Sequence, residues 1–177
     1  MVAAIRHEHP GATIDGDPLP REIRWGTGSV GFEYFQHDPL GLVLIRRGGY
    51  AVGLAREGRL VASKAGRRRV QSRTAAGGWS QQRYARRRAN QADELVEAVA
   101  EHAVRLLAGE QLQGLVVGGD RSLASAVLAE PGLGVLGELP RRELPDLPDP
   151  DLRLLQRALW RGRAVWCTGD LAGVSAP

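Results

Sequence analysis

Four residues near the middle of the chain have the properties needed for hydrolysis without charged catalytic groups. Gly77 and Gly78 come just before Gln81 and Gln82. Glutamine amides do not take up a proton, but they can orient a water molecule and hydrogen-bond a developing oxyanion. The glycines let a backbone enter a narrow site in conformations closed to other residues. Because an ordinary surface loop would also explain these residues, the pattern alone leaves both interpretations open.

The surrounding segment lacks the side chains that metal-dependent or acid–base catalysis needs. From Gly58 to Gln91 the sequence contains no Asp, Glu, His or Cys. Metal-assisted hydrolysis depends on carboxylate or imidazole ligands, and general acid–base catalysis depends on a titratable group. We therefore expect chemistry in this segment to use neither a metal ion nor any other cofactor.

Positive charge is concentrated around the same residues. The chain of 177 residues carries a net charge of +4, whereas residues 56–88 alone carry +10. Charge gathered in one part of a chain is typical of proteins that bind a polyanion. A basic face that contacts only water is the alternative.

A long helix is expected directly after the loop. Ser80 is a suitable N-cap, and Gly109 follows the end of the pattern near Leu107. Apolar side chains recur at helical spacing in the second half and predict a face that packs on a core. These side chains are Leu95, Val99, Ala103 and Leu106.

The arginines stand at the electrostatically unfavourable end of this helix. Arg83, Arg86 and Arg87 fall within an arc of ~100°, on a different face from the apolar stripe. A cation in the first turns of a helix costs about 0.3–1 kcal/mol, because the helix dipole is positive there. A bound phosphate would relieve this repulsion, since phosphates favour helix N-termini and arginine forks. The order of charges therefore predicts an anion at this surface.

The part of the chain before the helix is expected to form β-strands. Short apolar stretches alternate with glycine-containing turns, which is typical of hairpins and of a β-meander. An antiparallel pair is expected earlier, within the first forty residues. The expected strands are residues 22–25, 30–35, 42–46, 50–56, 60–64 and 68–73.

Strands and helices alternate after the long helix. This alternation predicts an α/β or α+β fold with a mixed sheet flanked by helices. Residues 1–40 are expected to pack on the same domain as residues 41–177. The expected elements are a strand at 114–117, a helix at 122–128, an exposed loop at 139–150, a helix at 151–160 capped by Asp151, and a strand at 164–167.

Composition limits the cellular setting. No stretch is apolar and long enough to span a membrane, and the first residues lack the apolar core of a signal peptide, so we expect a cytoplasmic protein without membrane contact. Cys167 is the only cysteine, which excludes an internal disulfide. Its apolar neighbours indicate a buried side chain.

Residues 77–88 resemble, without gaps, the Gly-Gly-Gln loop and following helix of class I release factors of eukaryotes and archaea. In that motif, Gly-Gly-Gln-Ser leads into Arg-Phe-Ala-Arg and a further Arg. Tyr84 stands for the Phe, and Trp79 occupies the place of the catalytic glutamine. The pattern Gly-Gly-x-x-Gln is more similar to the Vms-like release factor (VLRF) family, especially its actinobacterial group, over about residues 40–170. The matching residues are Gly77, Gly78, Ser80, Arg83, Ala85, Arg86 and Arg88.

This resemblance implies a release-factor middle-domain fold and a place of action on the ribosome. The domain would enter the vacant A site of a stalled large subunit, where the loop would reach the ester of P-site peptidyl-tRNA. The implied partners are large-subunit rRNA at the peptidyl transferase centre and peptidyl-tRNA, and a single-copy ribosomal site favours a monomer. A chain of 177 residues has no room for the codon-reading domains of decoding factors, so rescue of stalled ribosomes and quality control are expected.

The resemblance also implies roles for individual residues. Gln81 would orient the attacking water, with Gln82 as its substitute, while Gly77 and Gly78 would give the loop its geometry. Trp79 would either stack on a nucleotide or anchor the base of the loop. The arginines expected to bind rRNA or tRNA phosphates are Arg67, Arg68, Arg69, Arg73, Arg83, Arg86, Arg87 and Arg88.

Three functions are compatible with these residues. The first is a peptidyl-tRNA hydrolase that acts on stalled ribosomes. The second is a nuclease that cuts tRNA near its acceptor end, and the third is a non-catalytic module that only binds ribosomal RNA. All three require RNA binding that weakens with salt, so the products of the reaction must distinguish them.

Overall fold

A computed structural model of the chain describes residues 2–26, 28–67 and 79–169. The chain divides into two compact units, one made of Met1–Phe35 with Ala164–Pro177 and the other of Gln36–Arg163. Each unit has its own sheet. The expectation that residues 1–40 pack on the same domain as the rest stays a prediction.

The smaller unit is an antiparallel sheet with a short helix, α1 (Val2–Glu8). The expected pair of strands is confirmed, since Ile23 lies opposite Val30 in the register of β2 and β3. The last strand, β9, pairs with β3, and Cys167 is partly buried against the core of this unit. The strands are β1 (Thr13–Asp15), β2 (Glu22–Trp25), β3 (Gly28–Glu33) and β9 (Trp166–Gly169).

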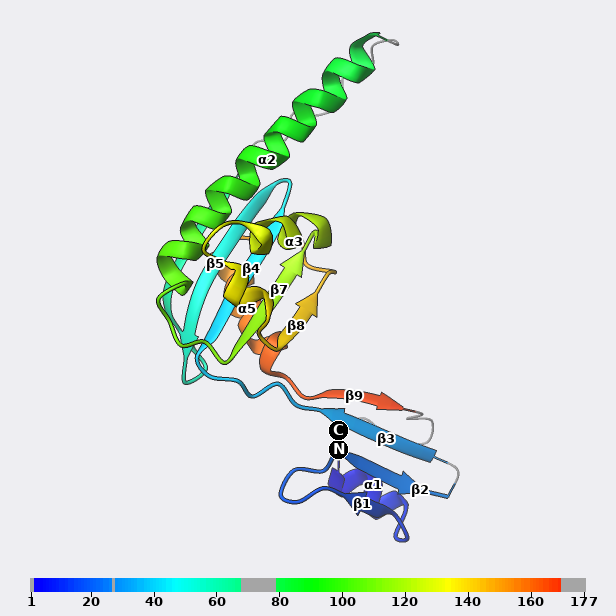
Figure 1. The fold of residues 1–177 in the computed structure, drawn as a ribbon. Coiled ribbons are helices and arrows are strands. Elements are labelled where there is room, and N and C mark those ends of the chain that lie inside the picture. The colour runs from blue at the N-terminus through cyan, green and yellow to red at the C-terminus, as the bar shows by residue number, and fades with distance from the viewer. Residues whose placement is uncertain (1, 27, 68–78, 170–177) are drawn as a thin grey trace. The chain divides into compact units, whose positions relative to one another are not determined.

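The larger unit is built on a mixed sheet of five described strands in the order β6-β5-β4-β7-β8 (Figure 1). Strands β4, β5 and β6 form the expected antiparallel meander, and β7 and β8 run parallel to β4. The expected strand at 68–73 lies outside the described residues. The strands are β4 (Leu40–Arg46), β5 (Gly49–Arg56), β6 (Arg59–Arg67), β7 (Gly114–Gly119) and β8 (Arg141–Leu144).

Helices cover both faces of this sheet, which confirms the expected fold class. On one face, α2 and α3 pack on Val43, Val52 and Val117. On the other face, α5 packs so closely that a side chain at Gly162 would collide with Val116. The helices of this unit are α2 (Trp79–Leu107), α3 (Arg121–Ala129), α4 (Gly134–Gly137) and α5 (Leu152–Arg163).

Two expectations about element boundaries are wrong. The stretch 139–150, expected to be an exposed loop, contains β8, in which the side chain of Arg142 is only 2% exposed. Prolines at 140 and 145 bracket these four residues, and prolines and charges are typical of short edge strands as well as of loops. Helix α2 begins at Trp79, so Ser80 lies within its first turn and is not the N-cap.

Within the described residues, none of the helices combines the length and the apolar character needed to cross a lipid bilayer.

Leu95 is the first buried side chain among those of α2 that the structure describes, and it should fix the helix to the sheet. It is 4% exposed and belongs to the main core. We expect Leu95→Ala to lower the free energy of unfolding by about 2–5 kcal/mol, because it removes buried methyl groups and leaves a cavity. Urea unfolding followed by circular dichroism measures this loss. Val135→Ala is the control, since Val135 is 80% exposed; equal losses in both variants would show that Leu95 does not anchor the helix.

Candidate functional site

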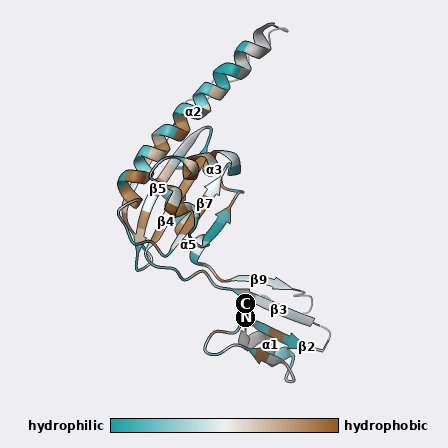
Figure 2. Ribbon diagram, in the orientation of Figure 1, coloured by the Kyte–Doolittle hydropathy of each residue, from teal (hydrophilic) through white to brown (hydrophobic). Residues whose placement is uncertain are grey.

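Helix α2 consists of two halves with different surroundings. Up to Glu94, the described side chains are exposed except for the partly buried Ala92. This half runs beyond the edge of the sheet (Figure 1), and it is 16 residues long from Trp79 to Glu94, which corresponds to about 24 Å of helix. Figure 2 shows apolar residues mainly in the half that lies on the sheet. The buried side chains of that half are Leu95, Val96, Val99, Ala100, Ala103 and Leu107.

The half of α2 from Trp79 to Glu94, here called the free half, carries the arginine face expected from the sequence. Arg83, Arg86 and Arg87 are exposed and line one shallow depression together with Asn90 and Glu94. Residues three and four positions apart are neighbours on a helix surface, so these side chains form a continuous stripe. Helix α2 has no acidic residue in its first turn. The stripe therefore presents donors with a positive charge, and the first acid that follows it along the helix is Asp93.

Arg88 is also exposed but points in another direction. It stands seven residues before Leu95, so it continues the line of the buried face into the free half. Arginines consequently occupy more than one side of the free half. A partner that contacts this half from two sides could use both.

Arg67 ends β6 immediately before the segment that leads to α2. Its guanidinium forms an ion pair with Asp151 (Nη2 to Oδ2, 3.5 Å), yet its side chain remains 82% exposed. Asp151 also accepts a hydrogen bond from the amide of Leu154 (2.8 Å), which caps α5. This hydrogen bond is the main cause that lowers the pKa of Asp151, and the charge of Arg67 lowers it further. Arg67 is thus held at the base of the segment with most of its surface open.

Two further arginines, which were not predicted as site residues, lie at the same end of the sheet. Arg46 ends β4 and Arg47 begins the turn to β5; both are exposed, and the register places Gly49 opposite Arg67. Arg46 donates a hydrogen bond to the carbonyl of Leu147 (Nη1 to O, 2.5 Å). A count of charge along a contiguous window could not include them. No local signal marks them, because only the register of β5 with β6 brings their turn beside Arg67.

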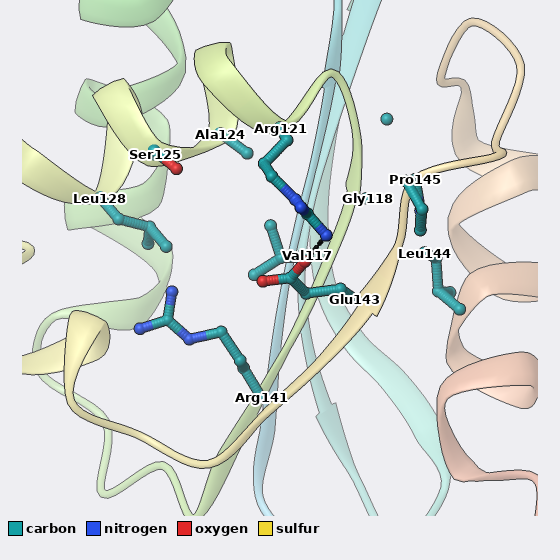
Figure 3. Close-up of a pocket in the computed structure, with 11 residues that line it drawn as sticks. Val117, Gly118, Arg121, Ala124, Ser125, Leu128, Arg141, Glu143, Leu144 and Pro145 are labelled. Carbon is teal, nitrogen blue, oxygen red and sulfur yellow. Dashed lines mark hydrogen bonds and ion pairs between the residues drawn. The ribbon is translucent and has the colours of Figure 1, made fainter. Parts of the chain in front are cut away.

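A small crevice opens between α3 and β8 at this end of the larger unit (Figure 3). Val117, Ala124 and Leu128 line it, and an ion pair joins Arg121 to Glu143 across it (Nη2 to Oε2, 2.7 Å). Glu143 is therefore held by a charge and is a poor candidate for a catalytic base. The crevice offers no second site for the chemistry expected of the glutamines.

Asp120 gives the turn before α3 a structural role. Its carboxylate accepts hydrogen bonds from the amides of Ser122 and Leu123 and from the Ser122 hydroxyl. The hydroxyl is the largest of the causes that lower the pKa of Asp120. Gly119 has a φ of 91° and comes so close to the carbonyl of Ile45 that a side chain would collide with it. Gly119 and Asp120 thus form the turn that caps the N-terminus of α3.

Only some of the residues expected to carry out or support the hydrolysis belong to the part of the chain that the structure describes. Gly77, Gly78, Arg68, Arg69 and Arg73 lie outside the described residues. The backbones of Trp79, Gln81 and Gln82 form the first turn of α2, and their side chains also lie outside the description. The choice between Gln81 and Gln82 stays a prediction.

A family model described as the Actinobacteria/chloroflexi VLRF1 release factor matches residues 38–168. The chain belongs to this family. The match includes nearly all of the larger unit, Gln36–Arg163, and continues into β9, so the sheet, α2 and α5 are parts of the VLRF1 domain. No curated protein matches the chain. Membership confirms the resemblance found in the sequence and gives the chain a ribosome-related release factor role.

The free half of α2 should be less stable than the anchored half in the absence of RNA. None of its described side chains is fully buried, and a helix without a packed apolar face is marginal in water. By hydrogen–deuterium exchange we expect the amides of residues 86–93 to exchange at least about a hundredfold faster than those of residues 99–106. A 20-nucleotide RNA should slow exchange only in the first group. Equal protection of both groups without RNA would show that the free half needs no partner.

Proposed function

We propose that the chain is a peptidyl-tRNA hydrolase that rescues stalled ribosomes. The observation that carries this proposal is the helix that begins at the glutamine segment. Its free half extends about 24 Å beyond the sheet and presents Arg83, Arg86 and Arg87 along one exposed face. A narrow, positively charged helix can enter a channel lined by RNA. Membership in a release factor family supports the ribosome as the source of that RNA.

The arginines hold the projection in place. Phosphate oxygens accept paired hydrogen bonds from arginine forks, and these bonds are stronger than neutral ones. Phosphates near the first turns of α2 also remove the repulsion between Arg83 and the helix dipole. Binding therefore stabilises the free half at the moment that it reaches its site. The start of α2 is thus positioned and stabilised in one step.

The chemistry assigned to the loop is attack of water on an ester. Gln81 orients the water, with Gln82 as its substitute, and the backbone of Gly77 and Gly78 allows close approach to the ester carbonyl. Water adds to the carbonyl carbon, the bond to the tRNA ribose oxygen breaks, and a peptide carboxylic acid and a tRNA hydroxyl result. Since residues 58–91 contain no titratable base except arginine, lysine and tyrosine, water or RNA oxygens must accept the proton.

This mechanism needs no metal ion, no other cofactor and no second copy of the chain. It places the protein in the cytoplasm, bound to the large subunit next to P-site peptidyl-tRNA. We propose rescue and quality control as its setting, because the glutamine segment acts on the ester without reading a codon.

Substitution of the glutamines separates release from cleavage of tRNA. Stalled nascent-chain complexes are incubated with excess protein, and peptide and tRNA are examined separately. We expect wild-type protein to release peptide and leave tRNA intact, and Gln81→Ala to slow release about 10²–10³-fold, the range found for loss of one oxyanion donor. Gln82→Ala should have the smaller effect. Gln113→Ala, at an exposed glutamine of the larger unit, is the control.

Each other outcome assigns a different function. Shortened tRNA would identify a nuclease. Binding without either product would identify a non-catalytic module. Release by the double variant Gln81→Ala/Gln82→Ala at the wild-type rate would refute the glutamine mechanism.

A further inference from the structure

Helix α5 carries a second basic face, separate from the arginine face of α2. Between Leu152 and Arg163 it contains four arginines and no acidic residue. One side of the helix is buried on the sheet through Leu155, Ala158 and Leu159. Leu155 contacts the face of β5 opposite to α2, since a side chain at Gly53 would collide with it. The arginines of α5 are therefore on another side of the domain from those of α2.

The exposed side of α5 combines arginines with an aromatic side chain. Four side chains of α5 lie within an arc of ~80–100°, because they are four, three and one positions apart along the helix. They are Arg153, Arg157, Trp160 and Arg161. Trp160 is 65% exposed. Its neighbours on this face are arginines and α5 contains no acidic residue, so the face is complementary in charge to a polyanion.

Two of the four arginines already have structural roles. Arg161 forms an ion pair with Asp146 (Nη2 to both carboxylate oxygens, 3.1 Å), and Arg163 forms one with Asp38 (3.4 Å). Both stand in the last turn, where cations complement the helix dipole.

The first two arginines lack such roles. Among the residues that the structure describes, the side chains of Arg153 and Arg157 form no ion pair, and both are exposed. Arg153 stands in the first turn, where a cation is unfavourable. These two charges remain for a ligand.

We propose that this face binds an unpaired nucleotide of large-subunit rRNA, with the base stacked on Trp160 and the flanking phosphates held by Arg153 and Arg157. Exposed aromatic side chains stack on bases of any sequence, and neighbouring arginines bind the backbone. The stripe from Arg153 to Arg161 is about 12 Å long, which is enough for more than one contact along a strand.

The direction of α5 selects rRNA over tRNA, and this step rests on the proposed function. The first residues of α5 lie beside Arg67, at the base of the glutamine segment. Its last residue, Arg163, lies beside Asp38, whose carboxylate accepts from the amide of Glu57 at the opposite end of the sheet (2.9 Å). Trp160 is close to that far end. RNA that reaches it while the loop is at the tRNA ester belongs to the ribosome.

Binding to vacant large ribosomal subunits tests this inference. We expect Trp160→Ala to weaken binding roughly 5- to 150-fold, the range for loss of one stacked base, and Trp160→Phe to restore it. Arg153→Gln/Arg157→Gln should lower the slope of log affinity against log salt concentration by about 1.4. Arg105→Gln removes the same kind of charge from an exposed position on α2 and should change neither quantity.

Thermal unfolding shows whether each variant is folded. If Trp160→Ala does not fold, Arg153→Gln/Arg157→Gln tests the same face, because both arginines are exposed. Unchanged binding of Trp160→Ala and of the arginine pair, while Arg86→Gln binds more weakly, would overturn the inference and leave the proposed function standing. Weaker binding to free tRNA but not to vacant subunits would overturn the assignment to rRNA. Absence of peptide release by wild-type protein would instead refute the proposed function, and leaves the binding result valid.

Discussion

The contact between the second half of α2 and the sheet determines where the arginines of α2 lie. Leu95, Val99 and Ala103 bury one side of this half against Val43 and Val52. A helix propagates rigidly from its anchored turns, so the same contact aims the free half and the glutamine segment at its start. None of the described side chains of the first half is fully buried, and its exposed surface carries the arginines.

This arrangement exchanges local stability for binding capacity. Arginines in the first turns weaken the free half, and none of its described side chains is fully buried. Under the proposed function, RNA phosphates would offset the first effect and contact with RNA would offset the second. The free half would then be most stable when it is bound to RNA. The two faces of the five-stranded sheet carry α2, which begins at the glutamine segment, and α5, with its arginines and Trp160.

The sequence allowed the long helix, the meander and the glutamine segment to be predicted because each has a local signature. Helical spacing of Leu95 and Val99, Gly-Gly turns and a charge cluster are all readable within a few residues. Strand β8 was missed because its pairing with β7 is a contact between distant residues, and its bracketing prolines also suit a loop. Arg46 and Arg47 were missed for the same reason, since only the sheet register brings their turn beside Arg67. The face of α5 required knowledge of which side the sheet buries.

The salt dependence of binding to large ribosomal subunits tests the central claim most directly, because each arginine–phosphate contact contributes to its slope. In the triple variant Arg83→Gln/Arg86→Gln/Arg87→Gln, the slope of log affinity against log salt concentration should fall by about 2–3 relative to wild type. A slope equal to that of wild type, in a variant that remains folded, would show that the projecting face of α2 does not bind RNA phosphates.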